Sequence, residues 1–304
     1  MKQVVSVSLG SSKRDHQVEV ELLGEKFSVG RKGTDGDVDG AITVLRELDG
    51  KVDAIGLGGV DLYLSDGVTK YVIQDALRLR QAVKETPVVD GSGLKNTLER
   101  EVVKYLYNES GLLRPGQKVL MVCGTDRFGM AETLAREVGC NTIFGDLMFT
   151  MGMSYPIQSI EELQELARKL LPEMSKMPIA TLYPTGKKQD ESSDKVAKFR
   201  AYFDDAEVIA GDFHFIRRFA PPELPDKLIL TNSTTSEDVE WLRRRGVRYL
   251  VTTTPDLNGR TFGTNVIEAM FLVLLGKRWE EIIPDDYLGL IKRLNLKPTI
   301  KELY

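Results

Sequence analysis

The residues with the clearest chemical meaning lie in a stretch that combines glycines with two aspartates. Gly124, Asp126 and Gly129 follow the apolar run 119–122, and Asp146 comes 22 residues after Gly124. This order of a buried strand, a glycine turn, a helix and a second strand is typical of the βαβ unit that opens a nucleotide-binding fold. The helix N–H groups and the positive end of the helix dipole favour an anionic ligand above such a turn. We therefore expect an anion site here, with Asp146 in the position that holds ribose hydroxyls.

Asp126 departs from the dinucleotide fingerprint Gly-x-Gly-x-x-Gly, because it stands in place of the middle glycine. That glycine normally lets a pyrophosphate come close to the backbone, whereas an aspartate adds bulk and a negative charge. Asp126 could instead be the N-cap of the following helix, a position that suits aspartate. The expected cofactor-binding residues of this unit are Gly124, Thr125, Asp126, Arg127, Phe128, Gly129 and Asp146.

Composition narrows the class of protein. The 304 residues are 42% hydrophobic and 28% charged, as in ordinary globular proteins, and the formal charge of −4 gives no reason to expect nucleic acid or an anionic membrane as partner. No apolar run approaches the ~20 residues of a membrane helix, and the N-terminus is too short and too alternating for a signal peptide. Two cysteines and two histidines leave little room for a metal centre. We expect a cytoplasmic protein without a metal.

The order of apolar runs and turn residues predicts four parts. These are a small N-terminal α/β substrate domain (1–92), a linking helix and loop (93–116), a doubly wound parallel-sheet, Rossmann-like nucleotide-binding domain (117–264) and C-terminal helices that pack back on the first domain (265–304). Six short strands are expected in the nucleotide-binding domain, as in a full dinucleotide fold: 119–123, 142–145, 179–183, 207–210, 228–231 and 249–253.

Two further stretches hold residues that could do chemistry. Asp90 ends a short strand beside a glycine turn, where α/β proteins place reactive groups, although it could also be a turn-forming Asx residue. In an extended segment 212–218, Asp212 and His214 would share one side. That segment could form an active-site edge with an anion-binding arginine, or a structural hydrogen-bonded corner.

Four patches, in their order and spacing, make residues 85–280 resemble the shikimate/quinate dehydrogenase family, and in particular bacterial proteins catalogued as quinate 5-dehydrogenase. Residues 90–93 (Asp-Gly-Ser-Gly) resemble the family's Thr-Asp-Gly-x-Gly segment, and residues 124–131 stand where its glycine loop stands. Thr253-Thr254-Pro255 followed by Gly259 resembles its Thr-Pro-x-Gly turn near the nicotinamide. Residues 263–276, with Glu268, resemble its final helix, where the family places a glutamine.

The resemblance implies an NAD-dependent dehydrogenase that oxidises a ring hydroxyl of a quinate- or shikimate-like cyclic polyol acid. Asp90 would be catalytic, with Lys70 or Lys95 as the nearest substitutes for the family's missing lysine motif. A lysine paired with a carboxylate in a partly dry cleft can shuttle the hydroxyl proton. No arginine closely follows Asp146, which favours NAD over NADP. Cofactor contacts would include Thr253 and Thr254, and substrate contacts would be Ser11, Ser12, Glu268 and His214.

Two other functions stay open at this point. The chain could be a non-catalytic ligand-binding or regulatory protein on the same scaffold, with Asp126 blocking the pyrophosphate. It could also be a nucleotide-dependent enzyme of another sort, with the ligand anchored by Arg127. The expected partner is a small molecule, not a nucleic acid or a membrane, and a homodimer is an option.

Overall fold

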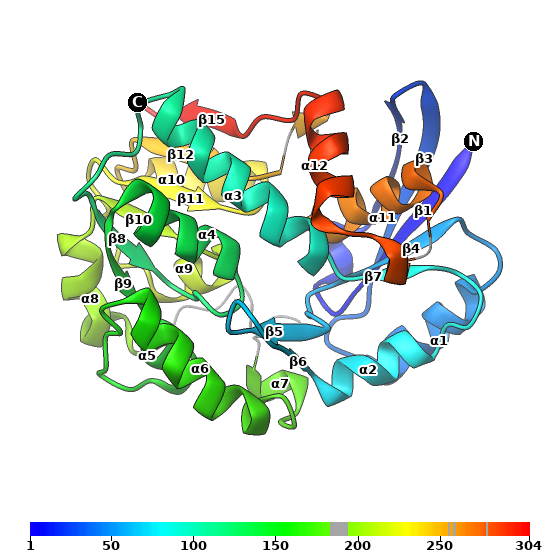
Figure 1. The fold of residues 1–304 in the computed structure, drawn as a ribbon, viewed down its shortest axis with the longest axis horizontal. Coiled ribbons are helices and arrows are strands. Elements are labelled where there is room, and N and C mark those ends of the chain that lie inside the picture. The colour runs from blue at the N-terminus through cyan, green and yellow to red at the C-terminus, as the bar shows by residue number, and fades with distance from the viewer. Residues whose placement is uncertain (183–193, 255, 258–259, 278) are drawn as a thin grey trace.

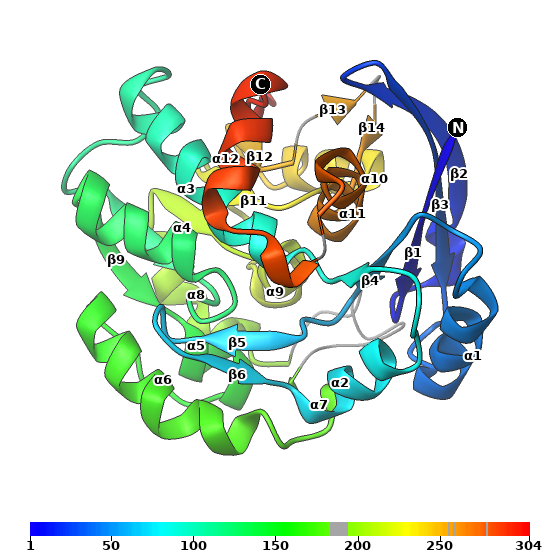
Figure 2. The same cartoon turned by 45° about the vertical axis from the view of Figure 1, so that its right-hand side comes forward.

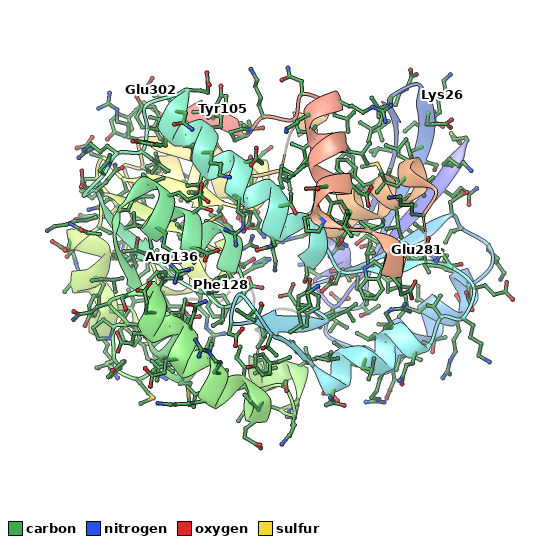
Figure 3. All side chains as sticks on the ribbon, in the orientation of Figure 1. Lys26, Tyr105, Phe128, Arg136, Glu281 and Glu302 are labelled. Carbon is green, nitrogen blue, oxygen red and sulfur yellow. The ribbon has the colours of Figure 1, made fainter. Side chains whose placement is uncertain are left out.

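The chain forms two α/β domains, each built on a mainly parallel sheet (Figure 1). The computed structural model describes residues 1–182, 194–254, 256–257, 260–277 and 279–304. The α/β class with two parallel-sheet domains is therefore confirmed. Figure 3 marks the two domains by Lys26, on the first sheet, and Glu302, on the second.

The first sheet has five strands in the order β2-β3-β1-β4-β7. Strands β3, β1, β4 and β7 are parallel, and only the edge strand β2 runs antiparallel to its neighbour β3. The elements of this domain are β1 (Lys2–Ser8), β2 (His16–Leu22), β3 (Glu25–Gly33), α1 (Val38–Leu48), β4 (Ala54–Gly58), the hairpin β5 (Tyr63–Ser65) and β6 (Lys70–Val72), α2 (Gln74–Gln81) and β7 (Val88–Val89).

The second sheet has six strands in the order β15-β12-β11-β10-β8-β9, of which only β15 is antiparallel. Its elements are β8 (Lys118–Met121), α4 (Phe128–Glu132) with a π-helical turn (Thr133–Val138), β9 (Asn141–Phe144), α5 (Asp146–Met151), α6 (Ile160–Met174), α7 (Ile179–Leu182), α8 (Val196–Asp205), β10 (Val208–Ala210), α9 (Phe213–Phe219), β11 (Leu228–Thr231), α10 (Ser236–Arg243), β12 (Tyr249–Thr252) and β15 (Thr299–Glu302).

The expected dinucleotide-type Rossmann sheet is not what forms. A full dinucleotide sheet has two strands beyond β8 on the β9 side, in the order 3-2-1-4-5-6. The strand expected at 179–183 would have supplied the second, but Ile179–Leu182 is helix α7 and packs on the first domain. The sixth strand is instead β15, from the C-terminal end of the chain, at the opposite edge. A short apolar run fits a strand or a buried helix equally well, so periodicity could not separate them.

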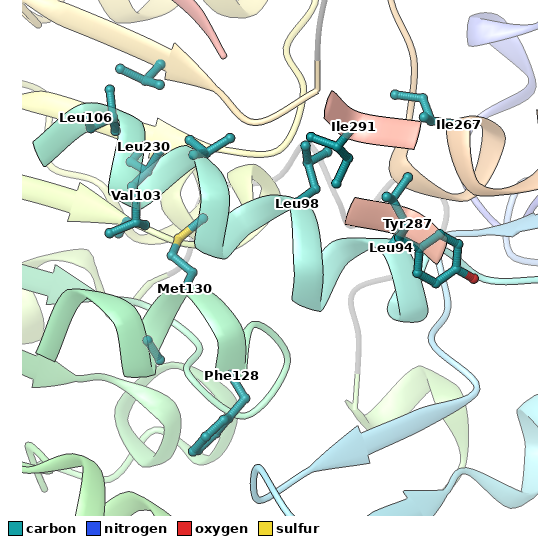
Figure 4. Packing of buried hydrophobic residues seen from close by; sticks show 14 of the residues in the cluster. Leu94, Leu98, Val103, Leu106, Phe128, Met130, Leu230, Ile267, Tyr287 and Ile291 are labelled. Carbon is teal, nitrogen blue, oxygen red and sulfur yellow. The ribbon is translucent and has the colours of Figure 1, made fainter. Parts of the chain in front are cut away.

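Three helices join the domains along the top of Figure 1: α3 (Ser92–Asn108), α11 (Thr264–Leu275) and α12 (Pro284–Arg293). Helix α11 packs on β4 and β1 of the first sheet, and α12 packs on α3. Figure 4 shows how Leu94, Leu98 and Val103 follow one another along α3, towards Ile291 of α12 and Met130 of α4. One apolar core therefore runs from the first domain through α3 into the second.

A second connection lies at the bottom of Figure 1, where the β5–β6 hairpin reaches α6 (Figure 2). The Gln164 side chain donates a hydrogen bond to the backbone oxygen of Asp66 at 3.1 Å. Phe128 points towards the hairpin (Figure 4), and a Cβ added at Gly67 would lie 2.2 Å from its ring. Leu171 and Ile179 are buried in the core of the first domain. The two domains are thus packed together on both sides of the space between them.

Close approach of α11 to the first sheet depends on Gly56 in β4. A Cβ at this position would lie 2.7 Å from the backbone oxygen of Asn265, which cannot swing away as a side chain could. The Asn265 side chain also donates a hydrogen bond to Ser6 on the neighbouring strand, at 2.8 Å. The glycine therefore sets the distance at which α11 docks.

We predict that Gly56→Ala lowers the free energy of unfolding by roughly 1–3 kcal/mol, the usual cost of overpacking a core. Gly30→Ala is the matched control, because it is a strand glycine of the same sheet whose added Cβ would meet nothing closer than 3.9 Å. Urea unfolding of both variants measures the difference. Equal stabilities would contradict the role given to Gly56.

Candidate functional site

A cleft of about 740 Å³ lies between the two domains. Its walls come from the carboxyl ends of β1, β4 and β7 in the first sheet and of β8, β10 and β11 in the second. Parallel α/β sheets bind ligands outside the carboxyl ends of their strands, and here both sheets present those ends to the same space. The volume falls within the range usual for small-molecule sites.

Five charged side chains line the cleft in a row of alternating sign, which we call the charge row: Asp61, Lys95, Asp126, Arg127 and Asp212. Lys95 Nζ lies 3.0 Å from Asp61 Oδ1 and 2.7 Å from Asp126 Oδ1. Arg127 Nε lies 3.5 Å from Asp126 Oδ2, and its Nη2 lies 3.0 Å from Asp212 Oδ2. The row starts in the first domain, passes through α3 and ends in the second domain.

Each member of the row is held by the element that carries it. Asp61 follows β4, and Lys95 lies in the first turn of α3. Asp126 and Arg127 belong to the turn between β8 and α4. Asp212 is the N-cap of α9, where its side chain accepts a hydrogen bond from the backbone N–H of His214 at 2.9 Å. Asn232, at the end of β11, donates to the other oxygen of Asp212 at 2.9 Å.

Burial and mutual attraction set the protonation of the row. Burial alone would raise the pKa of Asp126, but Lys95 and Arg127 hold it well below its usual range. Burial alone would lower the pKa of Lys95, but Asp126 and Asp61 raise it. The pKa of Asp61 is raised by burial and then by Asp126. The two cations therefore stay charged, whereas the carboxyl groups differ in their tendency to hold a proton.

Behind the row, Glu99 of α3 forms a buried ion pair with Arg127. Burial raises the pKa of Glu99, and its Oε2 has no hydrogen-bond partner among the described residues. The Nε of Arg127 is likewise without a hydrogen-bond partner in that part of the chain. Such unsatisfied groups are uncommon in a folded interior and call for a partner.

The residues expected to be catalytic do not form the expected pair, although Asp90 and Lys95 both line the cleft. Asp90 accepts hydrogen bonds from the backbone N–H of Leu62 and the hydroxyl of Ser92, both at 2.6 Å, so it organises a turn, as the Asx alternative has it. Lys95 points to the carboxylates of the charge row instead. Lys70 lies with its ammonium 4.4 Å from the centre of the Tyr63 ring. These positions do not provide the lysine–Asp90 pair on which the proton shuttle depends.

The glycine turn expected to bind a cofactor is filled from inside the protein. The Asp146 carboxylate accepts hydrogen bonds from the backbone N–H of Gly124 and of Thr125, both at 2.9 Å, and from the Thr125 hydroxyl at 2.8 Å. It is buried and begins α5, so it does not face the cleft as a ribose ligand would. Gly129 instead lets α4 approach α3, because an added Cβ would lie 2.5 Å from the Asn96 backbone oxygen.

The other residues expected to bind a cofactor also make contacts within the protein. Phe128 is buried against the β5–β6 hairpin, and Asp126 is a member of the charge row instead of capping α4. Thr254 donates a hydrogen bond from its hydroxyl to the backbone oxygen of Asn232 at 3.0 Å, and Thr253 is buried beside it. Pro255 and Gly259 lie outside the described residues. The NAD binding expected from the sequence is untested. It would require Asp146 to release the backbone N–H groups of Gly124 and Thr125.

The expected substrate residues fall in two places. His214 lines the cleft, but it lies in helix α9 and not in an extended segment, because Asp212 caps that helix. Ser11 caps a short helical turn, and Ser12 bonds to Asp35. Glu268 lies in the buried junction of α11, α3 and α12, where it accepts hydrogen bonds from Tyr287 and from the backbone N–H of Leu94.

Sequence reasoning missed Asp61, Arg31 and Asn232 as cleft residues. The glycine-rich exit 56–59 of β4 was the available signal for Asp61, because loops after such strands surround ligand sites. Arg31 donates to Asp15 at 2.7 Å and to Ser8 at 3.0 Å, and only the folded sheet brings these residues together. Among the described residues, no group of acidic, cysteine and histidine side chains is arranged to hold a metal, and no helix is long and apolar enough to cross a membrane.

Comparison with known proteins gives a family without a described activity. A family model described as "Domain of unknown function (DUF8754)" matches residues 93–303, and one described as "Domain of unknown function (DUF8753)" matches residues 3–90. The chain belongs to the DUF8754 family, whose model covers more than half of it. No curated protein matches the chain.

Solved structures similar to the chain include solute-binding and sugar-binding proteins. They include an ABC transporter solute-binding protein from Burkholderia multivorans, with 11% identity, a TM-score of 0.44 and coverage of 99% of this chain and 98% of that one. GanP, a glucose-galactose binding protein from Geobacillus stearothermophilus, has 9% identity, a TM-score of 0.41 and coverage of 99% and 97%. LsrB from Clostridium saccharobutylicum in complex with AI-2 has 12% identity, a TM-score of 0.40 and coverage of 90% and 82%. Likeness at this level does not identify a ligand for this chain.

The resemblance to shikimate/quinate dehydrogenases is wrong, and so are the NAD-dependent dehydrogenase and oxidoreductase assignments that followed from it. The two family models that match the chain are domains of unknown function and not dehydrogenase families. Two features of the structure also speak against a dehydrogenase. The second sheet lacks the strand order of a dinucleotide-binding domain, and the Asp146 carboxylate fills the glycine turn.

We predict that millimolar NAD⁺ leaves the melting temperature of the wild-type protein unchanged, because the N–H groups that would bind its pyrophosphate already bond to Asp146. A thermal-shift titration with NAD⁺ and NADP⁺ measures this. A melting temperature that rises with cofactor concentration would show that Asp146 yields its place.

We also predict a pH-dependent contribution of Glu268 to stability. Burial, helped by Asp90, raises the pKa of Glu268 from 4.5 to about 7. Between these values the folded state keeps a proton that the unfolded state has lost, so the free energy of unfolding falls as pH rises, by about 3 kcal/mol in total. Urea unfolding from pH 4.5 to pH 7.5 should show this fall in the wild type and a flatter curve in Glu268→Gln. Glu47→Gln, at an exposed position of α1, is the control, and a Glu268→Gln curve parallel to the wild type would refute the assignment.

Proposed function

We propose that the protein is a non-catalytic binding protein that takes a small, hydroxyl-rich organic molecule into the cleft between its domains. The observation that supports this most is the charge row at the carboxyl ends of both sheets. A hydroxyl group is both a donor and an acceptor of hydrogen bonds. A surface on which carboxylates and cations alternate over short distances can therefore receive neighbouring hydroxyls in sequence.

The pairing of the charges favours an uncharged ligand. Each cation of the row already has carboxylate partners within 3.0 Å. A charged ligand group would have to displace one of these partners and leave it buried and uncompensated, which costs several kcal/mol. A hydroxyl adds hydrogen bonds without separating an ion pair.

The lining of the cleft fits the same class of ligand. Arg127 and His214 contribute polar side chains to it, whereas Arg127 Nε and His214 Nδ1 are themselves buried, without a hydrogen-bond partner among the described residues. Phe262 and Val266 add apolar surface to the lining, which suits the C–H faces of a ring. A compact ring or short chain with several hydroxyls would use both kinds of surface.

The test is a thermal-shift panel of neutral pentoses, hexoses, alditols and cyclitols, together with their acid and amino derivatives. At least one neutral compound should raise the melting temperature in a concentration-dependent way, with calorimetry giving its Kd. A panel without any stabilising compound would count against the proposal, and stabilisation by the acids alone would contradict the choice of an uncharged ligand.

A matched pair of variants ties the binding to the cleft. Asp212→Asn removes a carboxylate from the charge row but keeps a good N-cap for α9 and leaves Arg127 its ion pair with Glu99, so the protein should still fold and binding should weaken about tenfold or more. Asp37→Asn makes the same change at the N-cap of α1, away from the cleft lining, and should bind like the wild type. Equal weakening in both variants would show that binding depends on helix capping and not on the row.

A further inference from the structure

The first three members of the charge row place two carboxyl groups against one ammonium group. Asp61 comes from the first domain, Asp126 from the second and Lys95 from the helix that joins them. Their side chains are 15%, 6% and 9% exposed, respectively. Water therefore does little to screen the repulsion between the two carboxylates, and one ammonium group compensates the charge of both.

The two carboxyl groups share one ammonium group. Lys95 Nζ lies 3.0 Å from Asp61 Oδ1 and 2.7 Å from Asp126 Oδ1. Two ionised carboxylates are acceptors only, so these two can bond to each other only where one of them carries a proton. Carboxylates that share a site behave in this way because both cannot be ionised at small cost.

The charged groups that face Asp61 decide which of the two carboxyl groups holds the proton. Lys95 and Asp126 are closest, Asp90 adds negative charge from the end of β7, and Tyr63 lies on the β5 side. Arg127 and Glu99 form an ion pair behind Asp126. Burial and Asp126 raise the pKa of Asp61, whereas Lys95 and Arg127 lower that of Asp126, so the proton belongs mainly to Asp61.

We propose that Asp61, Lys95 and Asp126 hold a single proton between the two carboxyl groups, and that this neutral triad makes Asp61 a specificity-determining residue that favours an uncharged over an amino-substituted ligand. The selection rests on the proposed function, whereas the shared proton does not. With one proton, the triad has one negative and one positive charge. A hydroxyl can bond to it as it stands, but an ammonium group must first displace the proton.

Nuclear magnetic resonance of protein labelled with ¹³C at the aspartate carboxyl groups tests the proton without a ligand. The Asp61 signal is assigned as the one absent from Asp61→Asn, whose amide can still donate a hydrogen bond to Asp126. The Asp61 carboxyl should stay protonated at pH values at which exposed aspartates are ionised. In Asp126→Asn, where Lys95 has a single carboxylate to compensate, it should titrate at lower pH. Ordinary titration of Asp61 in the wild type would overturn the proposal.

Binding of matched probes tests the selection. D-glucose with D-glucosamine and D-galactose with D-galactosamine are compared in the wild type and in Asp61→Asn, by calorimetry at pH 6 and at pH 8. The wild type should bind a neutral member more tightly, and any binding of its amino partner should release close to one proton, seen as a heat that depends on the buffer. Asp61→Asn should keep the preference for the neutral sugar and lose the proton release.

The outcomes separate the two proposals. If neither pair binds but Asp61 stays protonated, ligand binding by these sugars is refuted and the shared proton stands. If an amino sugar binds more tightly than its neutral partner, or binds without proton release, the neutral triad is overturned as the source of specificity even though a ligand is bound.

Discussion

The arrangement of the cleft depends on one lysine shared by carboxylates of both domains. Lys95 reaches its position because the chain turns sharply at Gly91, whose φ of 94° suits glycine, and Asp90 fixes that turn through the backbone N–H and hydroxyl of Ser92. Without the ammonium group, Asp61 and Asp126 would face each other in a nearly dry space, a situation that costs several kcal/mol. The helix that carries Lys95 is thus both a covalent link between the domains and the source of the charge that lets their carboxylates meet.

The width of the cleft is set by packing on two sides. Along one side, α3, α11 and α12 share a core with both domains, and along the other the β5–β6 hairpin and α2 pack on α6 and α7. The ion pairs at the floor of the cleft therefore do not have to hold the domains together against solvent. They are held at their distances by apolar surroundings, which is the condition under which buried charges can serve recognition.

The features that could be predicted from the sequence are those set by short-range patterns. The run 119–122, the glycine turn and the following helix could be recognised because strand, turn and helix each have a short-range pattern. The pairing of β15 with β12 and the helical state of 179–182 depend on distant partners, since the C-terminal segment docks on the sheet edge and α7 on the first domain. The contact of Asp61 with Lys95 joins residues 34 positions apart, one in the first domain and one in the linking helix, and no spacing rule could have predicted it.

The turn at Gly124 shows what a glycine motif does and does not determine. The motif specifies a strand, a tight turn and free N–H groups at a helix start, and those groups attract any anion that fits. In this protein the anion is the Asp146 carboxylate, supplied by the next strand end, so the turn that could have bound a phosphate instead fixes β8, α4 and α5 to one another. With the backbone donors used internally, the proposed recognition of a ligand rests on the side chains Asp126 and Arg127, which the same turn places in the lining of the cleft.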